Sequence, residues 1–191
     1  MSRILTIEKG WSLFLDRDGV INQRIQDDYV KQPGAFEFIP GVTEAMEIFA
    51  RYFNPVIVIT NQQGIGRGLM TSSQLSLVHD KMLQKITESG GRIDAVFYSP
   101  DLKNKGSFTR KPSVGLGLKA RKQFPSINFK QSIMAGDSYS DILFGHRLGM
   151  ATVLIGADKE LIFQCTGILD YSFADLISFA EYIKDNLTVK V

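Results

Sequence analysis

The sequence predicts an α/β protein in which helices cover both faces of a parallel sheet. Short apolar runs alternate along the chain with longer segments of helical periodicity. The apolar runs lack the polar–apolar alternation of a strand that faces water, as expected for strands covered on both faces. Repeated strand–helix alternation of this kind is typical of a three-layer arrangement around a parallel sheet.

Five short, mostly apolar runs are predicted to be strands. The first lies at residues 12–15, and the second, at 56–60, directly follows Pro55. Each run suits a strand and is too short for a typical helix. The strands are therefore expected, in chain order, at residues 12–15, 56–60, 93–98, 133–135 and 152–155.

The segments that follow these runs have the period of a helix. The clearest is 71–89, which begins with a capping-box pattern, Thr71 followed by Gln74, and stops before Gly90. Its apolar residues recur at helical spacing and form one stripe. We therefore expect helices at residues 42–53, 71–89, 114–124, 139–148 and 173–187.

Length and composition exclude several classes of protein. The 191 residues suit a single domain, 1–191, and 44% hydrophobic content excludes a disordered chain. The formal net charge of +2 favours neither a nucleic-acid partner nor an anionic membrane. A lone cysteine, Cys165, excludes an internal disulfide. No apolar run could span a bilayer and residues 1–10 lack a secretory signal pattern, so a cytoplasmic location is expected.

Polar side chains with a common chemistry stand at the ends of four predicted strands. Ligands of open α/β sheets bind outside the carboxyl ends of the strands, so these side chains are expected to meet at one edge. They include three carboxylates, a hydroxyl and two cations. In chain order they are Asp16 and Asp18, Thr60 and Asn61, Arg110 and Lys111, and Asp137, with Asp141 four residues further on.

The spacing of the acids indicates a Mg²⁺ site. Asp16 and Asp18 are two residues apart in extended chain, so both can face one ligand while Arg17 points elsewhere. Carboxylates that converge on one point repel each other and raise their pKa values unless a cation is present. Mg²⁺ prefers such oxygen ligands and often shares them with a substrate phosphate. Thr60 and Lys111 would then contact the phosphoryl oxygens that the metal leaves open.

Other interpretations explain single residues but not the whole set. An isolated Asp137 would most simply cap a helix, and a Lys-Pro pair would most simply lie in a solvated loop. The Asp-x-Asp-Gly run could begin a calcium loop, but Val20 and Asn22 do not continue that pattern. A dinucleotide-binding domain would need a glycine-rich turn after the first strand, where this chain has Asp16 and Asp18.

The four strand ends resemble the motifs of the haloacid dehalogenase-like (HAD) phosphohydrolase superfamily. The resemblance extends over about residues 13–155 and implies a three-layer, Rossmann-like sheet without a large cap domain. Finer features resemble the branch of D-glycero-D-manno-heptose 1,7-bisphosphate phosphatases and histidinol-phosphatases. The matching runs are LDRDGVIN at 15–22, ITNQ at 59–62, RKP at 110–112 and GDSYSD at 136–141.

The resemblance implies a role for each catalytic residue. Asp16 would attack phosphorus and form an aspartyl-phosphate, and Asp18 would act as general acid and then general base. Thr60 and Lys111 would hold the phosphoryl oxygens. Mg²⁺ would bind the Asp16 carboxylate, the Asp18 main-chain carbonyl and Asp137, with Asp141 in support. The residues implied in substrate binding are Asp28, Tyr29, Asn61, Gln62, Gln63 and Arg110.

The substrate implied by the resemblance is a small phosphorylated metabolite. Many members of the branch carry a zinc loop before the Arg-Lys-Pro motif, but residues 98–109 contain neither cysteine nor histidine, so no zinc is expected here. The segment 23–39 is expected to form a flap or loop beside the pocket. Heptose bisphosphate, histidinol phosphate and a catalytically silent binding module remain open, as do the oligomeric state and the role of Arg67.

Three further features are given structural interpretations. The glycine-rich run 64–68 matches no nucleotide-binding loop and is interpreted as a flexible turn. His79 and His146 lie in helical patterns without ligand-spaced partners, so each is expected to be a surface residue or a satisfied helix residue. Cys165 lacks a catalytic context and is expected to serve packing.

Overall fold

A parallel sheet forms the centre of the computed structural model, which describes residues 10–26, 28–103, 106–156 and 158–186. Within those residues the sheet has six strands in the order β3-β2-β1-β4-β5-β6. All neighbouring strands pair in parallel. The strands are β1 (Ser12–Leu15), β2 (Val56–Asn61), β3 (Ala95–Ser99), β4 (Ser132–Gly136), β5 (Ala151–Ile155) and β6 (Tyr171–Phe173).

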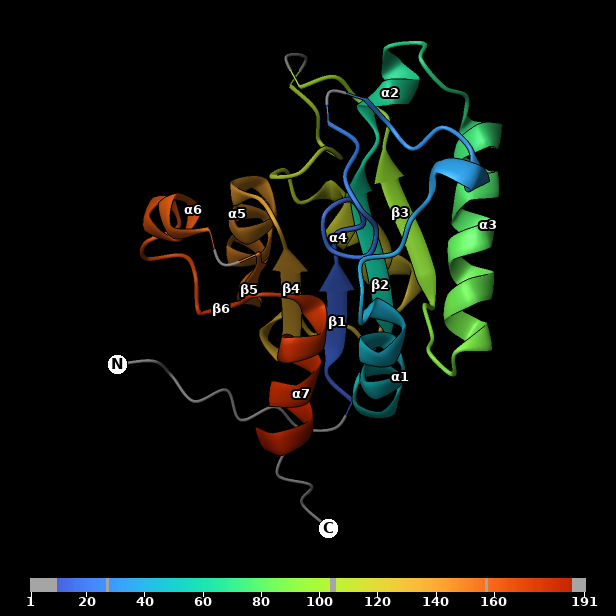
Figure 1. Cartoon of the computed structure of the whole chain (residues 1–191). Coiled ribbons are helices and arrows are strands. Elements are labelled where there is room, and N and C mark those ends of the chain that lie inside the picture. Colours follow the sequence, from blue (N-terminus) through green and yellow to red (C-terminus); the bar gives the residue numbers. More distant parts are fainter. Residues whose placement is uncertain (1–9, 27, 104–105, 157, 187–191) are drawn as a thin grey trace.

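Helices cover both faces of this sheet, as the sequence predicts (Figure 1). The α-helices in the described part of the chain are α1 (Val42–Tyr52), α2 (Gln63–Gly66), α3 (Ser72–Glu88), α4 (Gly115–Gln123), α5 (Tyr139–Leu148), α6 (Lys159–Gln164) and α7 (Leu176–Asn186). Two short 3₁₀ turns, η1 (Pro33–Ala35) and η2 (Phe129–Gln131), complete the elements. The fold class is therefore the predicted three-layer α/β sheet.

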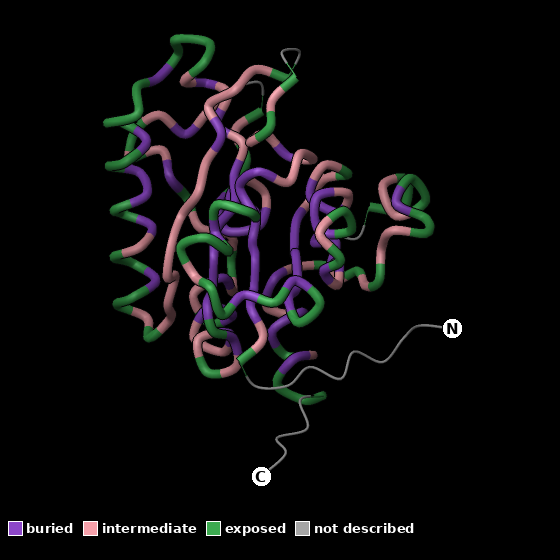
Figure 2. The backbone as a smooth tube through the Cα atoms, turned by 180° about the vertical axis from the view of Figure 1, so that it is seen from behind, coloured by how far each residue is buried: buried purple, intermediate pink, exposed green. Residues whose placement is uncertain are grey.

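The two faces of the central strand β1 belong to different apolar clusters. Leu13 and Leu15 pack in the cluster formed with α1, α3 and α7. Phe14, between them, packs on the other face, in the cluster formed with α4 and α5. Successive side chains of a strand point to opposite faces, so a fully apolar run is what this position requires. Figure 2 shows that buried positions dominate the central strands, whereas α3 is exposed along its outer side.

Local signals set the ends of two helices that lead to and from the carboxyl edge of the sheet. Thr71 and Gln74 form the predicted capping box at the start of α3. Ser138 and Asp141 form a second capping box at the start of α5, which leaves Asp137 outside the cap. The interpretation of Asp137 as a helix cap is therefore wrong, and its carboxylate is available at the sheet edge.

Three elements differ from the sequence-based prediction. The short helices α2 and α6 and the edge strand β6 were not expected. Phe173, placed in the last predicted helix, belongs to β6, where it pairs with Ile155 of β5. A three-residue strand has no periodicity of its own, and only the neighbouring strand makes it extended. Residues 1–9 and 187, which some predictions include, lie outside the described residues.

The order of the strands places a site at the ends of β1 and β4. β1 pairs with β2 on one side and with β4 on the other, so the chain reverses its direction of winding there. Ligands of open α/β sheets bind at this kind of switch point. The segment between β1 and α1 crosses the same edge, and its described residues form a single regular element, the short turn η1. Among the described residues, no helix combines the length and apolar character needed to cross a membrane.

Candidate active site

The centre of the site is an ion-paired lysine between two buried aspartates. Asp16 follows β1, and its backbone N–H donates to the Ala135 carbonyl at 3.0 Å. The Lys111 ammonium lies 2.7 Å from Asp16 Oδ1 and 2.6 Å from Asp141 Oδ1. It also donates to the Ile59 carbonyl at 2.6 Å. Because the Lys111 side chain is only 1% exposed, water screens these contacts poorly.

The side chain of Asn61 holds the backbone of Lys111 in place. The Lys111 N–H donates to Asn61 Oδ1 at 2.9 Å, and Asn61 Nδ2 donates to the Lys111 carbonyl at 3.2 Å. The end of β2 is thus fastened to a loop 50 residues away. The sequence predicted that Asn61 contacts substrate, but its amide group is already engaged, although it does line the cavity. Asn61 thus positions the Lys111 backbone, and its contact with substrate stays a prediction.

Carboxylates gather beside this ion pair. One oxygen from each of Asp16, Asp137 and Asp141 lies within 4.8 Å of the others. Burial raises the pKa of Asp16 to about 6; Lys111 opposes this rise, whereas Asp141 and Asp18 add to it. Burial and then the charges of Asp16 and Asp141 raise the pKa of Asp137 to about 8, despite the opposing Arg24. The expected repulsion between converging acids is thus present.

Lys111 responds to the same carboxylates in the opposite direction. Burial alone would lower the pKa of this ammonium. The charges of Asp141 and Asp16 outweigh burial, and the pKa of Lys111 is raised. Lys111 therefore remains a cation throughout the neutral range and can face a phosphoryl group.

Asp18 is held by three side chains from different parts of the chain. Its carboxylate accepts from Arg17 at 2.8 and 2.9 Å, from Asn22 at 3.0 Å and from Gln62 at 2.8 Å. Burial opposes ionisation, but Arg17 and these hydrogen bonds lower the pKa of Asp18. Asp18 is therefore held as a carboxylate, the form that a general base requires.

Arg17 was expected to point away from the site. Its side chain lies in the interior of the protein, but its guanidinium donates to the Asp18 carboxylate. Its side chain is 1% exposed. Its other terminal nitrogen lies 3.1 Å from Nε2 of His79 on α3. Burial and then Arg17 lower the pKa of His79 to about 4, so a neutral imidazole accepts this hydrogen bond. His79 is a buried, satisfied helix residue, which is one of the two expected roles.

Gln62 lies behind the cavity rather than in its lining. Its Nε2 donates to Asp18 at 2.8 Å and to Thr60 Oγ1 at 2.9 Å, and the residue is 1% exposed. Gln62 is not among the residues that line the cavity, and its direct contact with substrate stays a prediction. Gln62 links two residues of the predicted catalytic set.

Arg24 reaches the same cluster from the segment after β1. Its guanidinium donates to the Asp18 carbonyl at 3.2 Å and to Asp137 Oδ1 at 2.8 Å. Sequence reasoning missed this residue, since nothing local links position 24 to position 137. The chain also approaches Asp137 closely at Gly19, where φ is +91° and a Cβ would lie 1.8 Å from an Asp137 oxygen.

The oxygen atoms of this cluster suit a hard divalent cation. Carboxylates of Asp16 and Asp137 and the main-chain carbonyl of Asp18 are the kind of ligands that Mg²⁺ takes. A cationic guanidinium already binds two members of this set, Asp18 and Asp137. The pKa values of Asp16 and Asp137 are raised because the positive charge nearby does not offset their burial and the repulsion from nearby carboxylates. The residues present therefore fit Mg²⁺.

A cavity of about 500 Å³ opens over the cluster, and its lining carries as many cationic as acidic side chains. Arg24, Arg67, Arg110 and Lys111 all line it. The other predicted site residues that line it are Asp16, Asp18, Asp28, Tyr29, Thr60, Asn61, Gln63 and Asp141. With Mg²⁺ at the carboxylates to offset the acids, the arginines of this lining would suit a ligand with more than one anionic group.

A hydrogen-bonded cluster closes the loop that presents Arg110. The Asp101 carboxylate accepts from Thr109 at 2.6 Å and also from Ser107. Ser107 Oγ in turn accepts the Arg110 N–H at 2.8 Å, and the Arg110 side chain donates to the Asp101 carbonyl at 3.1 Å. The two ends of the loop are thus joined beside the cavity.

Comparison with known proteins agrees with this fold. A parallel sheet whose first strand is followed by Asp16, with Lys111 ion-paired to it, is typical of a HAD-type hydrolase. The family model described as HAD-hydrolase-like matches residues 108–161. The D-glycero-alpha-D-manno-heptose-1,7-bisphosphate 7-phosphatase of Mycobacterium bovis is 34% identical, covering 89% of this chain and 90% of that protein. The chain therefore belongs to the heptose-1,7-bisphosphate 7-phosphatase family of HAD phosphatases.

Two further relatives extend the comparison. The D-glycero-alpha-D-manno-heptose-1,7-bisphosphate 7-phosphatase of Campylobacter jejuni is 36% identical over 78% of this chain and 84% of its own. The crystal structure of the D,D-heptose 1,7-bisphosphate phosphatase from Bordetella bronchiseptica, complexed with magnesium and phosphate, matches with a TM-score of 0.83. It is 29% identical and covers 92% of this chain and 98% of its own.

Proposed function

We propose that this protein is a Mg²⁺-dependent phosphatase that removes the 7-phosphate of a D-glycero-D-manno-heptose 1,7-bisphosphate. The observation that carries the proposal is the buried Asp16–Lys111–Asp141 ion-pair cluster at the base of a cavity that three arginines also line. The names of the relatives support the choice of substrate, because 34% identity extends over nearly the whole chain. A bisphosphate also suits a lining that includes Arg24, Arg67 and Arg110.

In the first half of the proposed reaction, an Asp16 oxygen attacks phosphorus and the bond from phosphorus to the sugar oxygen breaks. The products are an aspartyl-phosphate and a sugar alkoxide, which takes a proton from Asp18. The hydrogen bonds around Asp18 favour its carboxylate form, so it must gain that proton when substrate arrives. A phosphate dianion nearby raises the pKa of a carboxyl group and so favours this step.

In the second half, Asp18 returns as the carboxylate and removes a proton from water. The oxygen of that water attacks phosphorus, the bond to Asp16 breaks, and inorganic phosphate leaves. Thr60 and Lys111 hold the phosphoryl oxygens in both halves, where positioning and charge stabilisation do most of the catalytic work. Bound to Asp16, Asp137 and the Asp18 carbonyl, Mg²⁺ supplies positive charge to the transferring phosphoryl group.

The remaining expectations are part of the same proposal. We propose one catalytic domain over residues 1–191, without a zinc site, acting in the cytoplasm in carbohydrate metabolism. The free and buried Cys165 is consistent with a reducing compartment. Neither a nucleic acid nor a membrane is proposed as a partner.

Phosphate release from a panel of phosphorylated metabolites tests the proposal. The panel contains both anomers of the heptose 1,7-bisphosphate, histidinol phosphate and p-nitrophenyl phosphate, each with Mg²⁺ and with a chelator. We expect Mg²⁺-dependent release, with the highest kcat/KM for one heptose bisphosphate anomer. A higher value for histidinol phosphate would contradict the substrate, and the absence of metal-dependent release from every compound would favour a silent binding module.

A further inference from the structure

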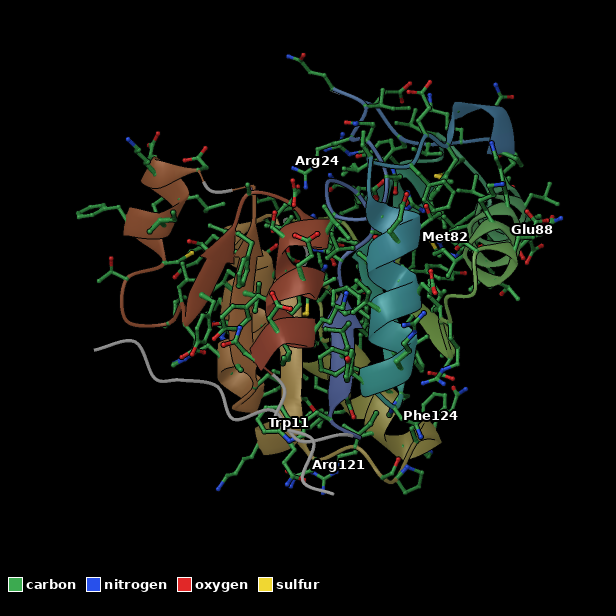
Figure 3. All side chains as sticks on the ribbon, turned by 60° about the horizontal axis from the view of Figure 1, so that its bottom comes forward. Trp11, Arg24, Met82, Glu88, Arg121 and Phe124 are labelled. Atoms are coloured by element: carbon green, nitrogen blue, oxygen red, sulfur yellow. The ribbon has the colours of Figure 1, made fainter. Side chains whose placement is uncertain are left out.

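Arg24 binds two of the oxygen atoms assigned to the metal. Its guanidinium contacts the Asp18 main-chain carbonyl at 3.2 Å and Asp137 Oδ1 at 2.8 Å. Both atoms belong to the oxygen set that fits Mg²⁺. The ion pair joins residues 113 positions apart in the chain, so local sequence preference does not create it. In Figure 3 Arg24 lies at the end of the molecule opposite Trp11 and Arg121, where the strand-end loops gather.

Arg24 is free to leave this position without a change in the backbone beside it. The Gln23 N–H donates to the Glu37 carbonyl at 2.8 Å, and Asn22 donates to the Gln23 carbonyl at 2.8 Å. The chain next to Arg24 is therefore anchored. The Arg24 side chain itself is 56% exposed, and exposed ion pairs of this kind are weak. Rotation of the side chain alone can break the contact.

We infer that Arg24 is a tethered cation that changes partners, from Asp137 in the metal-free protein to a phosphate of the substrate once Mg²⁺ is bound. The inference rests on the Mg²⁺ site of the proposed function. Two cations cannot share the same pair of oxygens, because both need the same space and like charges repel. Mg²⁺ carries the higher charge and therefore displaces the guanidinium.

A second partner for Arg24 is available inside the cavity. Arg24 lines the cavity together with Arg67 and Arg110, so a bound phosphate lies within the region that these side chains surround. Arginine recognises phosphate through paired N–H donors. The displaced side chain can thus exchange a carboxylate for a phosphate, and metal binding prepares the cavity for an anionic substrate.

Two binding measurements on purified protein test this exchange without requiring catalysis. The first is a titration of chelator-treated protein with Mg²⁺ by calorimetry. In Arg24→Gln the competing cation is gone, and we expect Mg²⁺ to bind about three- to tenfold more tightly. The second is a titration of the Mg²⁺-saturated protein with inorganic phosphate, where Arg24→Gln is expected to bind about threefold or more weakly.

Two variants serve as matched controls. Arg24→Lys keeps the charge but loses the paired N–H donors, so in both titrations it is expected to lie between the wild type and Arg24→Gln. Arg67→Gln removes a charge from the same cavity lining, and no contact of Arg67 with Asp137 is present in the described residues. In the Mg²⁺ titration Arg67→Gln is expected to change the affinity less than Arg24→Gln does.

The outcomes separate this inference from the proposed function. Tighter Mg²⁺ binding together with weaker phosphate binding in Arg24→Gln supports the exchange. Unchanged affinity in either titration overturns it, as does an equal effect of Arg67→Gln on Mg²⁺, while the proposed function then remains intact. If neither the wild type nor Arg24→Gln binds Mg²⁺, the metal site and the inference both fail.

Discussion

The base and the rim of the cavity are built on different principles. At the base, Asp16 and Lys111 are buried and fastened to the ends of strands, with the Lys111 side chain 1% exposed. At the rim, Arg24, Arg67 and Arg110 come from loops, and the Arg24 side chain is 56% exposed. Buried groups on a sheet keep the precise geometry that phosphoryl transfer needs, while loop residues can adapt to the rest of a substrate. The contrast predicts that changes at the rim act mainly on substrate binding and changes at the base mainly on the reaction.

The largest effect is expected from Asp16→Asn at the base. The amide cannot act as the nucleophile, so Mg²⁺-dependent phosphate release should fall at least about a thousandfold. The fold should persist, because the amide has nearly the same shape and removes one charge from a crowded acidic cluster. Phosphate release and thermal unfolding, measured on the same preparation, check both points. Retained hydrolysis in this variant would remove Asp16 from the mechanism.

Asn61→Ala tests whether the residues at the base of the cavity need Asn61 to position Lys111. Loss of the two hydrogen bonds to the Lys111 backbone should displace the ammonium and lower kcat by about ten- to a hundredfold, with little change in KM. Steady-state kinetics with p-nitrophenyl phosphate separate the two parameters. A rise in KM with unchanged kcat would instead support the substrate contact that the sequence predicted for Asn61.

The charges at the base of the cavity predict that both stability and Mg²⁺ affinity depend on pH. The pKa of Asp137 is raised to about 8 in the metal-free fold from an ordinary value of 3.8. The folded state therefore binds more protons than the unfolded chain, and metal-free stability should fall as pH rises from about 4 to about 8. Mg²⁺ needs the carboxylate, so its affinity should rise by up to about tenfold per pH unit below pH 8.

Thermal unfolding between pH 5.5 and 8.5, with Mg²⁺ and with a chelator, measures this dependence. The gap between the two melting temperatures should widen as pH rises. Asp137→Asn has no titrating carboxyl at this position and should show a smaller change with pH. A gap in the wild type that is constant over the whole range would contradict the charge balance described for Asp16 and Asp137.

Arg110→Ala probes the rim and should act mainly on binding. We expect KM for the heptose bisphosphate to rise about five- to twentyfold, with kcat changed by less than about threefold, because the guanidinium donates to the Asp101 carbonyl and is not part of the Asp16–Lys111 ion pair. A fall in kcat as large as that of Asn61→Ala would show that the rim and the base are not separable.

The smallest effect is expected from Asp101→Ala, which contacts the rim through Arg110. Loss of the hydrogen bonds from Ser107 and Thr109 should loosen the loop and raise KM about two- to fivefold. Combined with Arg110→Ala it should add nothing further, because both changes act through one side chain. Full additivity in this double-mutant cycle would argue against that link.

Sequence patterns were sufficient for the parts of the protein that depend on local or periodic signals. The central strands were predicted almost to the residue, because burial on both faces requires unbroken apolar runs such as that of β1. The gathering of Asp16, Lys111 and Asp137 at one edge follows from the rule for parallel sheets. The edge strand β6 escaped prediction, because a neighbouring strand rather than its own three residues makes it extended.

The sequence by itself determined that acids, a hydroxyl and a lysine follow successive strands, and therefore that a phosphate and a cation were to be expected. Only the tertiary structure decided which of these side chains pair with one another. Asn61 meets Lys111 across 50 positions, and Arg24 meets Asp137 across 113. The physical reason is that periodicity reports which face of an element is buried. A hydrogen bond instead depends on two side chains that reach the same point in space.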